Sequence, residues 1–471
     1  MAIHEECGVF GIYTAPGCEE ELAASSCYYG LFALQHRGQE SCGIAINNDG
    51  EITCLKDMGT VGEVFNSDNL SRLKGSIAIG HVRYSTTGAS TKANAQPLVT
   101  QYVKGTISLA HNGNLTNCIR LREELENEGA IFQTTVDSEV IAYMIAKARS
   151  KSASIEDAVK EVMGKIEGGY ALLVMSPRKL IAARDPYGLK PLAMGRLGDS
   201  IVFASESCAI SAVGAQFVRD IKPGEIVVVD DSGVTSIETP SHKCAKCIFE
   251  YIYFARPDST LDGISVYESR IRAGRLLARQ HPVEADIVIG VPESGLDAAI
   301  GYSRESGIPY AKGFVKNSYV GRTFIKPSQQ QRENSVKIKL GAIESEVKGK
   351  RIVMTDDSIV RGTTMANIVK MLRRAGATEV HVRISSPPFL NPCFYGTDVP
   401  SREKLIACQH SIDEICEIIG ADSLGYLDVN SLDDMLDEPG HFYCDACFTG
   451  NYPNIDSGID VLIQGGEKLE K

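Results

Sequence analysis

A chain of 471 residues exceeds what one hydrophobic core usually supports, and a hydrophobic content of 43% is ample to bury more than one. Its net charge of −12 argues against a nucleic-acid partner, because a phosphate backbone needs a broad basic face. No apolar run is long enough to cross a bilayer, and the first residues lack the basic and apolar regions of a signal peptide, so we expect a soluble cytoplasmic protein without membrane contact.

Near the N-terminus, Cys7 begins a strand-like run over residues 7–12 and is a candidate nucleophile. A free α-amine titrates near ~7.7–8.0 and can act as the base for a neighbouring thiol, whereas a peptide nitrogen has no basicity. Cys7 would therefore work only as the first residue. This predicts that residues 1–6 are a propeptide removed by cleavage of the Glu6–Cys7 bond. The alternative is that Cys7 is a small buried hydrophobe.

The first half of the chain predicts short strands and hairpins covered by amphipathic helices. One helix is expected from Asp137 through Lys151, and another is capped by Ser154, with an apolar stripe that reaches Ile166. The pattern breaks at residues 239–243, which we interpret as a linker. The strand-like runs fall at residues 77–85, 106–111, 170–176, 179–184 and 201–205.

Polar motifs at residues 36–40, 80–86, 111–115 and 137–139 follow Cys7 in the chain. Together they resemble glutamine amidotransferases of the N-terminal-nucleophile class. The resemblance implies that Arg83 binds the α-carboxylate of glutamine and that Asp137 binds its α-ammonium. It also implies an oxyanion hole formed by Asn112 and Gly113. Taken singly, Arg83 could be a surface ion pair, Asp137 a helix N-cap and Asn112-Gly113 a hairpin turn.

Beyond the linker, the pattern alternates as in βα units, with helices at residues 268–280 and 296–305 and strands at residues 286–291, 351–356 and 379–385. The strand at 351–356 ends in two carboxylates, Asp356 and Asp357, and a Gly-Thr turn then opens a helix. Backbone N–H groups at a helix start face an anion, so this loop predicts a site for a 5′-phosphate. The two carboxylates could bind ribose hydroxyls or Mg²⁺; the alternative is an ordinary turn with a solvated acidic pair. The loop residues are Ser358, Ile359, Val360, Arg361, Gly362, Thr363 and Thr364.

Residues 312–351 carry ten Lys or Arg against three Glu, although the whole chain is acidic. Arg322 and Lys326 lie there in a stretch rich in Gly, Pro and Gln, which predicts a mobile loop. We interpret this loop as a lid that closes over pyrophosphate and excludes water. The alternative is a solvated basic loop.

Fourteen cysteines in a cytosolic chain favour thiols and metal ligands over a disulfide framework. Soft thiolates suit iron–sulfur clusters and zinc equally, so the residues alone leave the metal open, with free thiols as a third possibility. Cys244 is spaced C-x-x-C with Cys247, which leaves open which of the two ligates. The four candidate ligands after the linker are Cys247, Cys393, Cys444 and Cys447.

Nearly the whole chain, from Cys7 to about Pro453, resembles the glutamine phosphoribosylpyrophosphate amidotransferases, or amidophosphoribosyltransferases. Residues 250–259, 291–295 and 316–325 extend the match. The resemblance implies an α+β domain, the N-terminal-nucleophile αββα sandwich, over residues 7–239. It also implies an α/β domain, a type I phosphoribosyltransferase with a doubly wound parallel sheet, over residues 247–453, and a C-terminal tail at 454–471.

The resemblance further implies an activity, the first step of de novo purine synthesis. Cys7 would hydrolyse glutamine, and the ammonia would pass to phosphoribosylpyrophosphate, giving 5-phosphoribosylamine, pyrophosphate and glutamate. Ser294, Asp356 and Asp357 would contact Mg²⁺ or ribose, and Arg322 and Lys326 would cover the reacting centre. In the iron–sulfur branch of the family the four cysteines ligate a [4Fe-4S] cluster, with zinc as the less favoured metal here.

The family is expected to form homo-oligomers, often tetramers, and to be inhibited by purine nucleotides. Two other functions stay open at this stage. A glutamine-dependent enzyme with another acceptor, such as the sugar-isomerising synthase, would share the first half, but the Asp356-Asp357 loop disfavours it. A non-catalytic sensor of phosphoribosylpyrophosphate would have no reason to retain Cys7, Arg83, Asn112 and Asp137.

Overall fold

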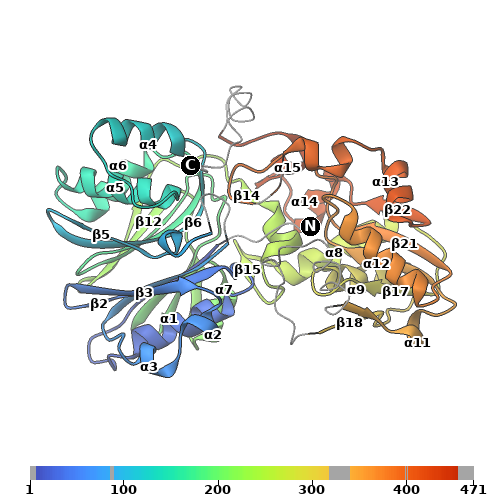
Figure 1. The fold of residues 1–471 in the computed structure, drawn as a ribbon, viewed down its shortest axis with the longest axis horizontal. Helices are drawn as coiled ribbons and strands as arrows, with labels where there is room; N and C mark the ends of the chain where they lie inside the picture. The colour runs from blue at the N-terminus through green and yellow to red at the C-terminus, as the bar shows by residue number, and fades with distance from the viewer. Residues whose placement is uncertain (1–6, 85–89, 318–339, 398, 400, 455–471) are drawn as a thin grey trace.

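The computed structural model describes residues 7–84, 90–317, 340–397, 399 and 401–454. The first half of the chain forms a stack of two sheets and two helical layers, and the second half forms a separate body beside it (Figure 1). The described elements from β1 to β13 lie in the first body. Regular structure stops at Glu238 and resumes at Lys246, where the linker is predicted.

The first sheet of the stack has seven strands, with β1 and β4 near its middle. β1 lies between β10 and β4, and Gly8 pairs with Val82. This places Cys7, which directly precedes β1, beside the end of β4. In spatial order the strands are β11 (Gln216–Asp220), β9 (Ala193–Leu197), β10 (Ser200–Ala204), β1 (Gly8–Tyr13), β4 (Ile77–Arg83), β2 (Ser41–Asn48) and β3 (Glu51–Met58).

The second sheet has six strands and packs face to face against the first. Val9 and Ile79 of the first sheet share one buried cluster with Ala110 and Leu173 of the second. All of its neighbouring strands are antiparallel. In spatial order the strands are β13 (Gly233–Glu238), β12 (Glu225–Asp230), β8 (Leu180–Arg184), β7 (Gly168–Met175), β6 (Gly105–Leu115) and β5 (Leu98–Tyr102).

Helices cover the outer face of each sheet, which completes the four layers (Figure 1). The first sheet carries α1 (Leu22–Ala33), α2 (Val61–Val64) and α7 (Ser207–Ala212), and the second carries α4 (Cys118–Asn127), α5 (Asp137–Arg149) and α6 (Ile155–Met163). The short α3 (Ser67–Leu70) and η1 (Lys92–Asn94) lie in connections. The predicted αββα sandwich is therefore confirmed.

The strands predicted in this half are all present, but one of them is longer than expected. β6 continues to Leu115, because Asn112 pairs with Ala171 and Gly113 pairs with Tyr170 in the ladder with β7. Asn and Gly are depleted in strands, which is why the sequence favoured an end at His111. The hairpin-turn alternative for Asn112-Gly113 is therefore wrong.

The second body is built on a four-stranded parallel sheet. Its strands, in spatial order, are β17 (Ile287–Gly290), β20 (Arg351–Asp356), β21 (Glu379–Ile384) and β22 (Ser423–Tyr426). One face packs on α8 (Val266–Gln280), α9 (Gly295–Ser306) and α14 (Leu432–Leu436), and the other on α12 (Thr363–Arg374) and α13 (Ile412–Ile419). Helices on both faces of a parallel sheet make the doubly wound arrangement that was predicted.

Shorter elements connect this sheet to the rest of the molecule. A π-helix, η2 (Glu250–Phe254), follows the linker, and two-residue strands β14 (Lys246–Cys247) and β23 (Tyr443–Cys444) pair in parallel. The remaining elements are β15 (Thr260–Leu261), β16 (Ile264–Ser265), β18 (Phe314–Lys316), β19 (Leu340–Ala342), α11 (Glu344–Val347), η3 (Arg402–Lys404), η4 (Ile406–Cys408), η5 (Val429–Ser431) and α15 (Ala446–Thr449).

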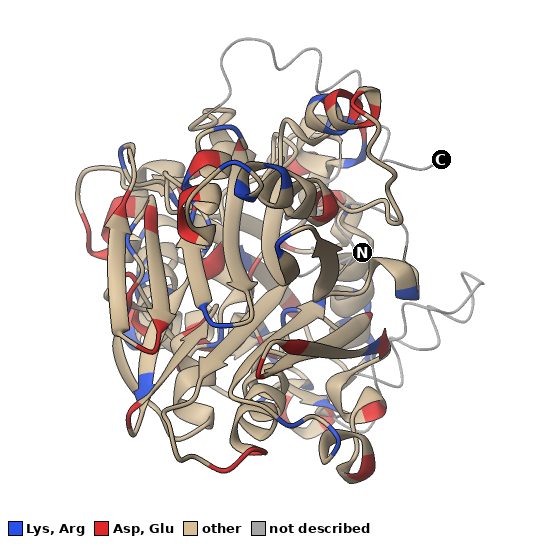
Figure 2. Ribbon diagram, turned by 90° about the vertical axis from the view of Figure 1, so that its left-hand side faces the viewer, with Lys and Arg blue, Asp and Glu red and all other residues tan. Residues whose placement is uncertain are grey.

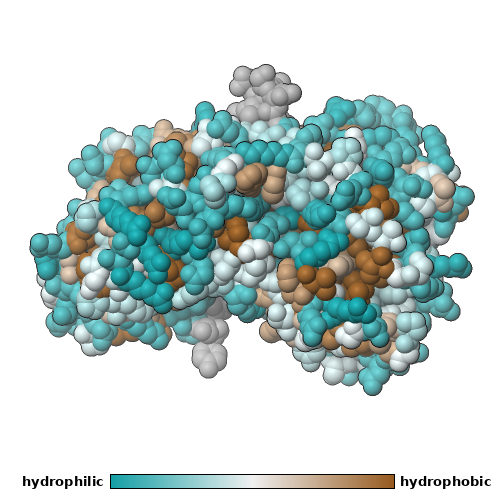
Figure 3. Space-filling model, turned by 180° about the vertical axis from the view of Figure 1, so that it is seen from behind, coloured by the Kyte–Doolittle hydropathy of each residue, from teal (hydrophilic) through white to brown (hydrophobic). Residues whose placement is uncertain are grey.

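The surface carries mixed charge and scattered apolar patches. Seen from the end of the first body, acidic and basic residues are interspersed without a continuous basic face (Figure 2). The face in Figure 3 shows hydrophobic groups in small areas among hydrophilic ones. Among the described residues, no helix combines the length and the apolar character that crossing a membrane requires.

Candidate active sites

Cys7 lies at the start of the central strand β1, in a buried position. Its side chain is 8% exposed, and its Sγ donates to the carbonyl oxygen of Tyr84 at 3.5 Å. Burial raises the pKa of the Cys7 thiol to about 11, while the positive charges of Arg83 and Lys190 act in the opposite direction and the charge of Asp137 adds to the rise. The fold therefore brings Arg83 and Asp137, two of the residues singled out in the sequence, near the same thiol.

Arg37, from the motif at 36–40, holds the backbone of Cys7 through a hydrogen bond to its carbonyl group. Its Nε donates to the Cys7 carbonyl at 3.0 Å, and its guanidinium pairs with Glu206 at 2.7 Å and with Glu250 at 2.6 Å. All three charged side chains are buried. Glu250 belongs to η2 of the second body, so this ion-pair cluster joins Cys7 and the strand that follows it to the other half of the molecule. Sequence reasoning assigned Arg37 no role, although its motif was noticed.

Arg83 and Asp137 are both buried, which excludes their simpler interpretations. Arg83, the last residue of β4, is 2% exposed and cannot be a surface ion pair. The N-cap of α5 is Val136, so Asp137 is instead the first helical residue. Its Oδ2 accepts from the backbone N–H of Leu115 at 3.0 Å. Burial alone would raise the pKa of Asp137, but His111 and the Leu115 N–H bring it below its usual value.

Asn112 and Gly113 lie within β6, and each has an unusual feature: Asn112 has an amide without a partner among the described residues, and Gly113 has a positive φ. The Asn112 side chain is fully buried, and neither its Nδ2 nor its Oδ1 has a hydrogen-bond partner among the described residues. Gly113 has φ 139°, and a Cβ there would lie 2.0 Å from the carbonyl oxygen of Gly169. A buried amide without a partner costs roughly 1–3 kcal/mol, a cost that a ligand atom in the site would remove.

The second site lies at the carboxyl ends of β17 and β20. Asp356 and Asp357 are each 8% exposed, and the Asp357 N–H donates to Asp356 Oδ1 at 3.0 Å. Ser294, at the start of α9, donates its hydroxyl to Asp357 Oδ1 at 2.6 Å, and the Ser358 hydroxyl donates to the same carboxylate. Burial, and then the charge of Asp357, raise the pKa of Asp356 well above its usual value. The pair therefore favours a proton or a cation.

The loop after Asp357 divides into an anchored part and an exposed part. Ile359 and Val360 are buried, and the Val360 carbonyl accepts from the N–H of Ile406 at 2.9 Å, so these two residues can offer a ligand only their backbone. Gly362 has φ 77° at the N-cap of α12. Arg361, Thr363 and Thr364 are exposed at the mouth of the loop. The predicted lid residues Arg322 and Lys326 lie outside the described residues.

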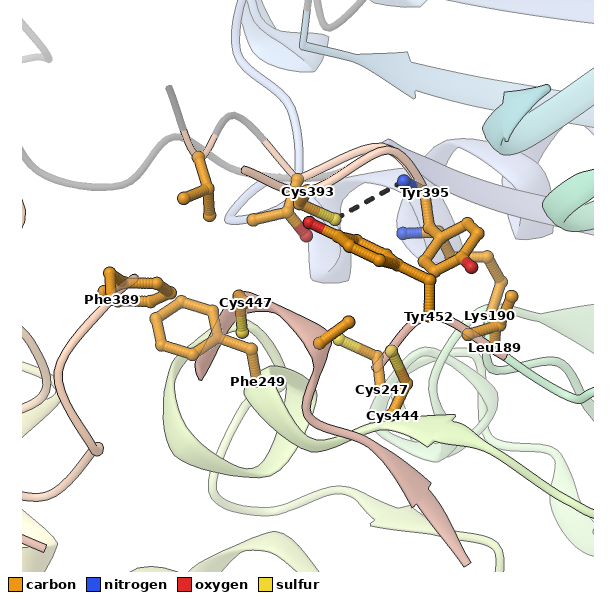
Figure 4. Close-up of a pocket in the computed structure, with 13 residues that line it drawn as sticks. Leu189, Lys190, Cys247, Phe249, Phe389, Cys393, Tyr395, Cys444, Cys447 and Tyr452 are labelled. Atoms are coloured by element: carbon orange, nitrogen blue, oxygen red, sulfur yellow. Dashed lines mark hydrogen bonds between the residues drawn. The ribbon is translucent and has the colours of Figure 1, made fainter. Parts of the chain in front are cut away.

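Four cysteines meet in one small cavity between the two bodies (Figure 4). The cavity holds about 20 Å³, and its other walls include Phe249, Phe389 and Lys190. Pairing of β14 with β23 sets Cys247 directly beside Cys444. Burial, and then the charges of the other three thiols, raise the pKa of Cys447 well above its usual value. The lining cysteines are Cys247, Cys393, Cys444 and Cys447, whereas Cys244 does not line the cavity.

These four thiols are not grouped as ligands of a single ion. Within the described part of the chain, no set of three or more His, Cys, Asp or Glu side chains is close enough to hold one metal ion. A tetrahedral zinc site needs its thiolates about 2.3 Å from one centre. A four-iron cluster binds each thiolate at a different iron and so spreads them farther apart.

The two halves of the chain match two family models. One describes a glutamine amidotransferase domain and matches residues 81–212, and the other describes a phosphoribosyl transferase domain and matches residues 269–385. These spans contain Arg83, Asn112 and Asp137 in the first case and Asp356 and Asp357 in the second.

Curated relatives and solved structures match over almost the full length. The amidophosphoribosyltransferase of Archaeoglobus fulgidus is 50% identical over 450 residues, which is 95% of this chain and 98% of that protein. The Bacillus subtilis enzyme is 50% identical over 457 residues, which is 96% of this chain and 94% of the relative. The structure of glutamine phosphoribosylpyrophosphate amidotransferase from B. subtilis, complexed with ADP and GMP, has a TM-score of 0.88 at 49% identity, covering 95% of this chain and 97% of that one.

This similarity decides between the functions that the sequence left open, because it covers the acceptor domain as well as the glutamine domain. A synthase with another acceptor would share only the first half, whereas the full-length relatives are amidophosphoribosyltransferases. The chain belongs to the amidophosphoribosyltransferase family, the glutamine-dependent pentosyltransferases that catalyse the first step of purine biosynthesis.

Proposed function

We propose that Cys7 is the nucleophile of the glutaminase half and that it acts as the first residue of a processed chain. In the unprocessed chain its nitrogen belongs to the Glu6–Cys7 peptide, which has no basicity. Residues 1–6 are a propeptide in this proposal, residues 7–239 form the glutaminase domain and residues 247–453 form the phosphoribosyltransferase domain, with a tail at 454–471. The free α-amine accepts the thiol proton, and the sulfur then attacks the carboxamide carbon of glutamine.

Arg83 and Asp137 hold the amino-acid end of glutamine during this step. A buried guanidinium binds a carboxylate with two parallel hydrogen bonds, and the Asp137 carboxylate, whose pKa is below its usual value, is charged and ready for an ammonium group. The Asn112 side-chain amide and the Gly113 N–H donate to the oxygen that becomes negative as sulfur adds to the carbon. Water then releases glutamate from the thioester.

The main support for this assignment is the side-chain amide of Asn112, which is unpartnered within the described part of the chain. Its amide is fully buried and has no partner among the described residues, on a strand that faces the Cys7 strand. A buried amide without a partner does not stabilise the fold. A donor held in position before substrate arrives does stabilise the transition state, because it need not reorganise.

In the second half, the loop from Ser358 to Thr364 is proposed to bind the 5′-phosphate of phosphoribosylpyrophosphate. Asp356, Asp357 and Ser294 present oxygens, the ligand type that Mg²⁺ prefers. Bound Mg²⁺ would neutralise charge on the leaving pyrophosphate. Arg322 and Lys326, which lie outside the described residues, remain the proposed lid. Ammonia must travel between the sites unprotonated, since ammonium has no lone pair to attack C1 with.

A [4Fe-4S] cluster is the group that best fits the cysteine cavity. Four thiols from distant parts of the chain converge there among apolar side chains, and thiolates are the usual ligands of such clusters. We therefore assign the ligands as Cys247, Cys393, Cys444 and Cys447, with zinc as the less favoured metal. Equal amounts of iron and inorganic sulfide in brown, anaerobically purified protein would support the assignment, and colourless protein containing zinc would overturn it.

Purine nucleotides are proposed as feedback inhibitors, on the support of the B. subtilis structure that was complexed with ADP and GMP. A homo-oligomer, with a tetramer as the expected form, and a cytoplasmic location complete the proposal. Light scattering on purified protein at several concentrations, with and without GMP, tests the assembly and its response to nucleotide together.

The two-site assignment is tested by the substitution Cys7→Ala. Glutamine-dependent formation of phosphoribosylamine should fall by about 10⁴-fold or more, because the nucleophile is lost. Synthesis from added ammonium salt should persist within about twofold, because the second site is intact. The matched control is Cys42→Ala, a buried cysteine in β2, which should retain both activities. Equal loss of both activities in Cys7→Ala would contradict the scheme, and active wild-type protein that begins at Ala2 would contradict the processing step.

A further inference from the structure

The peptide group that follows Cys7 lies at the very start of the strand that carries it. The ladder of β1 with β4 begins with the pair of Gly8 and Val82, so Cys7 precedes the ladder. In the processed chain nothing comes before Cys7, and its backbone is tied to the fold from one side only. Because a peptide group is planar, the orientation of the Cys7–Gly8 peptide sets the position of the Cα that carries both the thiol and the α-amine.

The side chain of Arg37 holds this peptide. Its Nε donates to the Cys7 carbonyl at 3.0 Å, and its stem runs beside the strand, since a Cβ on Gly8 would lie 3.4 Å from Arg37 Cδ. Arg37 is 1% exposed. A guanidinium buried in this way is held in place by its carboxylate partners. The orientation of the Cys7 carbonyl therefore depends on those partners.

One of the two carboxylates comes from the second domain. Glu250 is buried and accepts from Arg37 Nη1 at 2.9 Å and from Nη2 at 2.6 Å, a two-pronged pair. Glu206 of the first domain accepts from Nη1 at 2.7 Å, and it also accepts from the Ser259 hydroxyl at 2.7 Å. Two parallel hydrogen bonds fix the plane of a guanidinium, whereas a single bond leaves it free to turn. Glu250 thus sets the orientation of the group that holds Cys7.

The second domain presents Glu250 on the rigid turn η2. The N–H of Ala255 donates to the Glu250 carbonyl at 3.0 Å, which is the i→i+5 bond of a π-helix. Arg270 of α8 donates to three carbonyls of this turn, those of Tyr251 at 2.9 Å, Tyr253 at 2.9 Å and Ala255 at 2.7 Å. Single π-turns are rare and are frequent at functional sites.

We propose that Glu250 is a positioning residue of the glutaminase reaction, supplied by the phosphoribosyltransferase domain. Through Arg37 it fixes the Cys7–Gly8 peptide and so aligns the thiol with the amide carbon of glutamine. The proposal rests on the assignment of Cys7 as nucleophile. The glutaminase domain alone, residues 7–239, lacks this carboxylate, so its nucleophile is aligned only when the second domain is docked.

The first test is the substitution Glu250→Gln in processed, metal-loaded enzyme. Glutaminase kcat should fall by about 10–100-fold, because a small misplacement of the attacking atom is costly. The KM for glutamine should stay within about threefold, because Arg83 and Asp137 still bind the amino-acid end. Ammonium-dependent synthesis should persist within about twofold, which also shows that the second domain is folded. Glu250→Asp keeps the charge but is one methylene shorter, so its kcat should be intermediate; it carries the test if Glu250→Gln does not fold.

Two alkylating reagents separate the alignment of the Cys7 thiol from its reactivity. A diazoketone analogue of glutamine alkylates Cys7 from the glutamine position, whereas iodoacetamide needs no such orientation. Mass spectrometry of the N-terminal peptide follows both reactions. Glu250→Gln should slow labelling by the analogue about tenfold or more and should change labelling by iodoacetamide by less than about twofold. A general loss of packing around Cys7 would instead accelerate its reaction with iodoacetamide.

A matched control is Asp262→Asn, which weakens another buried pair between the same two domains. Asp262, in the turn between β15 and β16, accepts from Arg184 Nη1 and Nη2 at 2.7 and 2.8 Å. This variant should have a lower Tm, while its glutaminase kcat stays within about twofold of wild type.

Three results would overturn the proposal: unchanged kcat in both Glu250 variants, equal slowing of the two reagents, or a loss of kcat in Asp262→Asn as large as that in Glu250→Gln. Failure of the proposed function is distinguishable from these. In that case the glutamine analogue would not label Cys7 in the wild type, and glutamine-dependent turnover would survive Cys7→Ala.

Discussion

The glutaminase site and the phosphoribosyl site place their functional groups on different kinds of structure. Cys7, Arg83 and Asn112 lie on or beside strands inside a four-layer stack, and each is nearly or fully buried. In the second domain, Arg361 is exposed on a loop at the carboxyl end of the parallel sheet, and Thr363 is exposed where that loop enters α12. Strands hold a site within fractions of an ångström, whereas loops at a sheet end admit a large charged ligand. Folding thus positions the side chains of the first site, whereas the second site is completed by its ligands.

The two sites also differ in the interaction that each leaves unsatisfied. In the first, the Asn112 amide lacks a hydrogen-bond partner among the described residues. In the second, two adjacent carboxylates are buried together, and the pKa of Asp356 is raised well above its usual value. A missing partner is supplied by a neutral or developing oxygen, while paired carboxylates require a cation. Substitutions can therefore separate the two sites.

The largest effect is expected at Gly113. A Cβ there would lie 2.0 Å from a backbone oxygen, at a φ of 139° that other residues rarely adopt. Gly113→Ala should abolish glutaminase activity and destabilise the protein by about 3 kcal/mol or more, as measured by urea unfolding. At Gly362 of the second site, a Cβ would meet side-chain ends alone, Ile406 at 2.7 Å and Ile419 at 3.8 Å, so Gly362→Ala should cost about 1–2 kcal/mol. Equal losses of stability in the two variants would contradict the contrast between a rigid strand and an adaptable loop.

Removal of the oxyanion donor should be the next largest effect. Asn112→Ala should lower glutaminase kcat by about 10²–10³-fold and leave ammonium-dependent synthesis unchanged. Because the lost amide has no partner among the described residues, stability should fall by less than about 1 kcal/mol. Asn117→Ala provides the converse, since Asn117 bonds Lys165 and Glu167: it should reduce stability without changing glutaminase kcat. A large stability loss in Asn112→Ala would show that Asn112 serves the fold.

In the second site, Asp357→Asn should weaken Mg²⁺-dependent binding of phosphoribosylpyrophosphate by about 10–100-fold, because one of two adjacent charges is lost. Isothermal titration with the ligand and Mg²⁺ measures this directly, and basal glutaminase activity should persist. Asp286→Asn, at the amino end of the same sheet where Asp286 pairs with Arg351, is the control and should leave ligand binding intact. Similar weakening in both variants would place the cation elsewhere.

The smallest effect concerns the ligand-free protein. Because the folded pKa of Asp356 is raised, its contribution to stability is present at low pH and is lost as pH rises through the folded value. Asp356→Asn keeps an acceptor for the Asp357 N–H and removes this loss. The Tm of Asp356→Asn should exceed that of wild type by about 2–4 °C near pH 8, with a smaller gain near pH 5. An equal gain in Tm at both pH values would contradict the raised pKa of Asp356.

Much of this architecture is predictable from local patterns. The helix beginning at Asp137, the N-cap Ser154 and the strand ending at Asp356 were expected and are present, since periodicity and capping operate within a few residues. The end of β6 was missed because Asn112 and Gly113 are unfavourable in isolated strands. Only the ladder with β7 keeps them there, and that is a tertiary effect.

The parts that escaped prediction depend on contacts between distant segments. Nothing around Glu250 in the sequence links it to Cys7, because the link runs through Arg37, which lies 213 residues earlier in the chain. Cys247 rather than Cys244 lines the cavity because β14 pairs with β23, a contact that the local sequence does not show. Motif residues could be named from the sequence, whereas the groups that hold them could not.

The pairing of β14 with β23 has a consequence for assembly on the ribosome. Lys246 and Cys247 leave the exit tunnel early in synthesis of the second domain, and Tyr443 and Cys444 leave near its end. Long-range pairing must wait for both partners, so the cysteine cavity closes only when this domain is almost fully translated. A nascent chain that stalls before Tyr443 would expose Cys247 to oxidants and its apolar neighbours to chaperones.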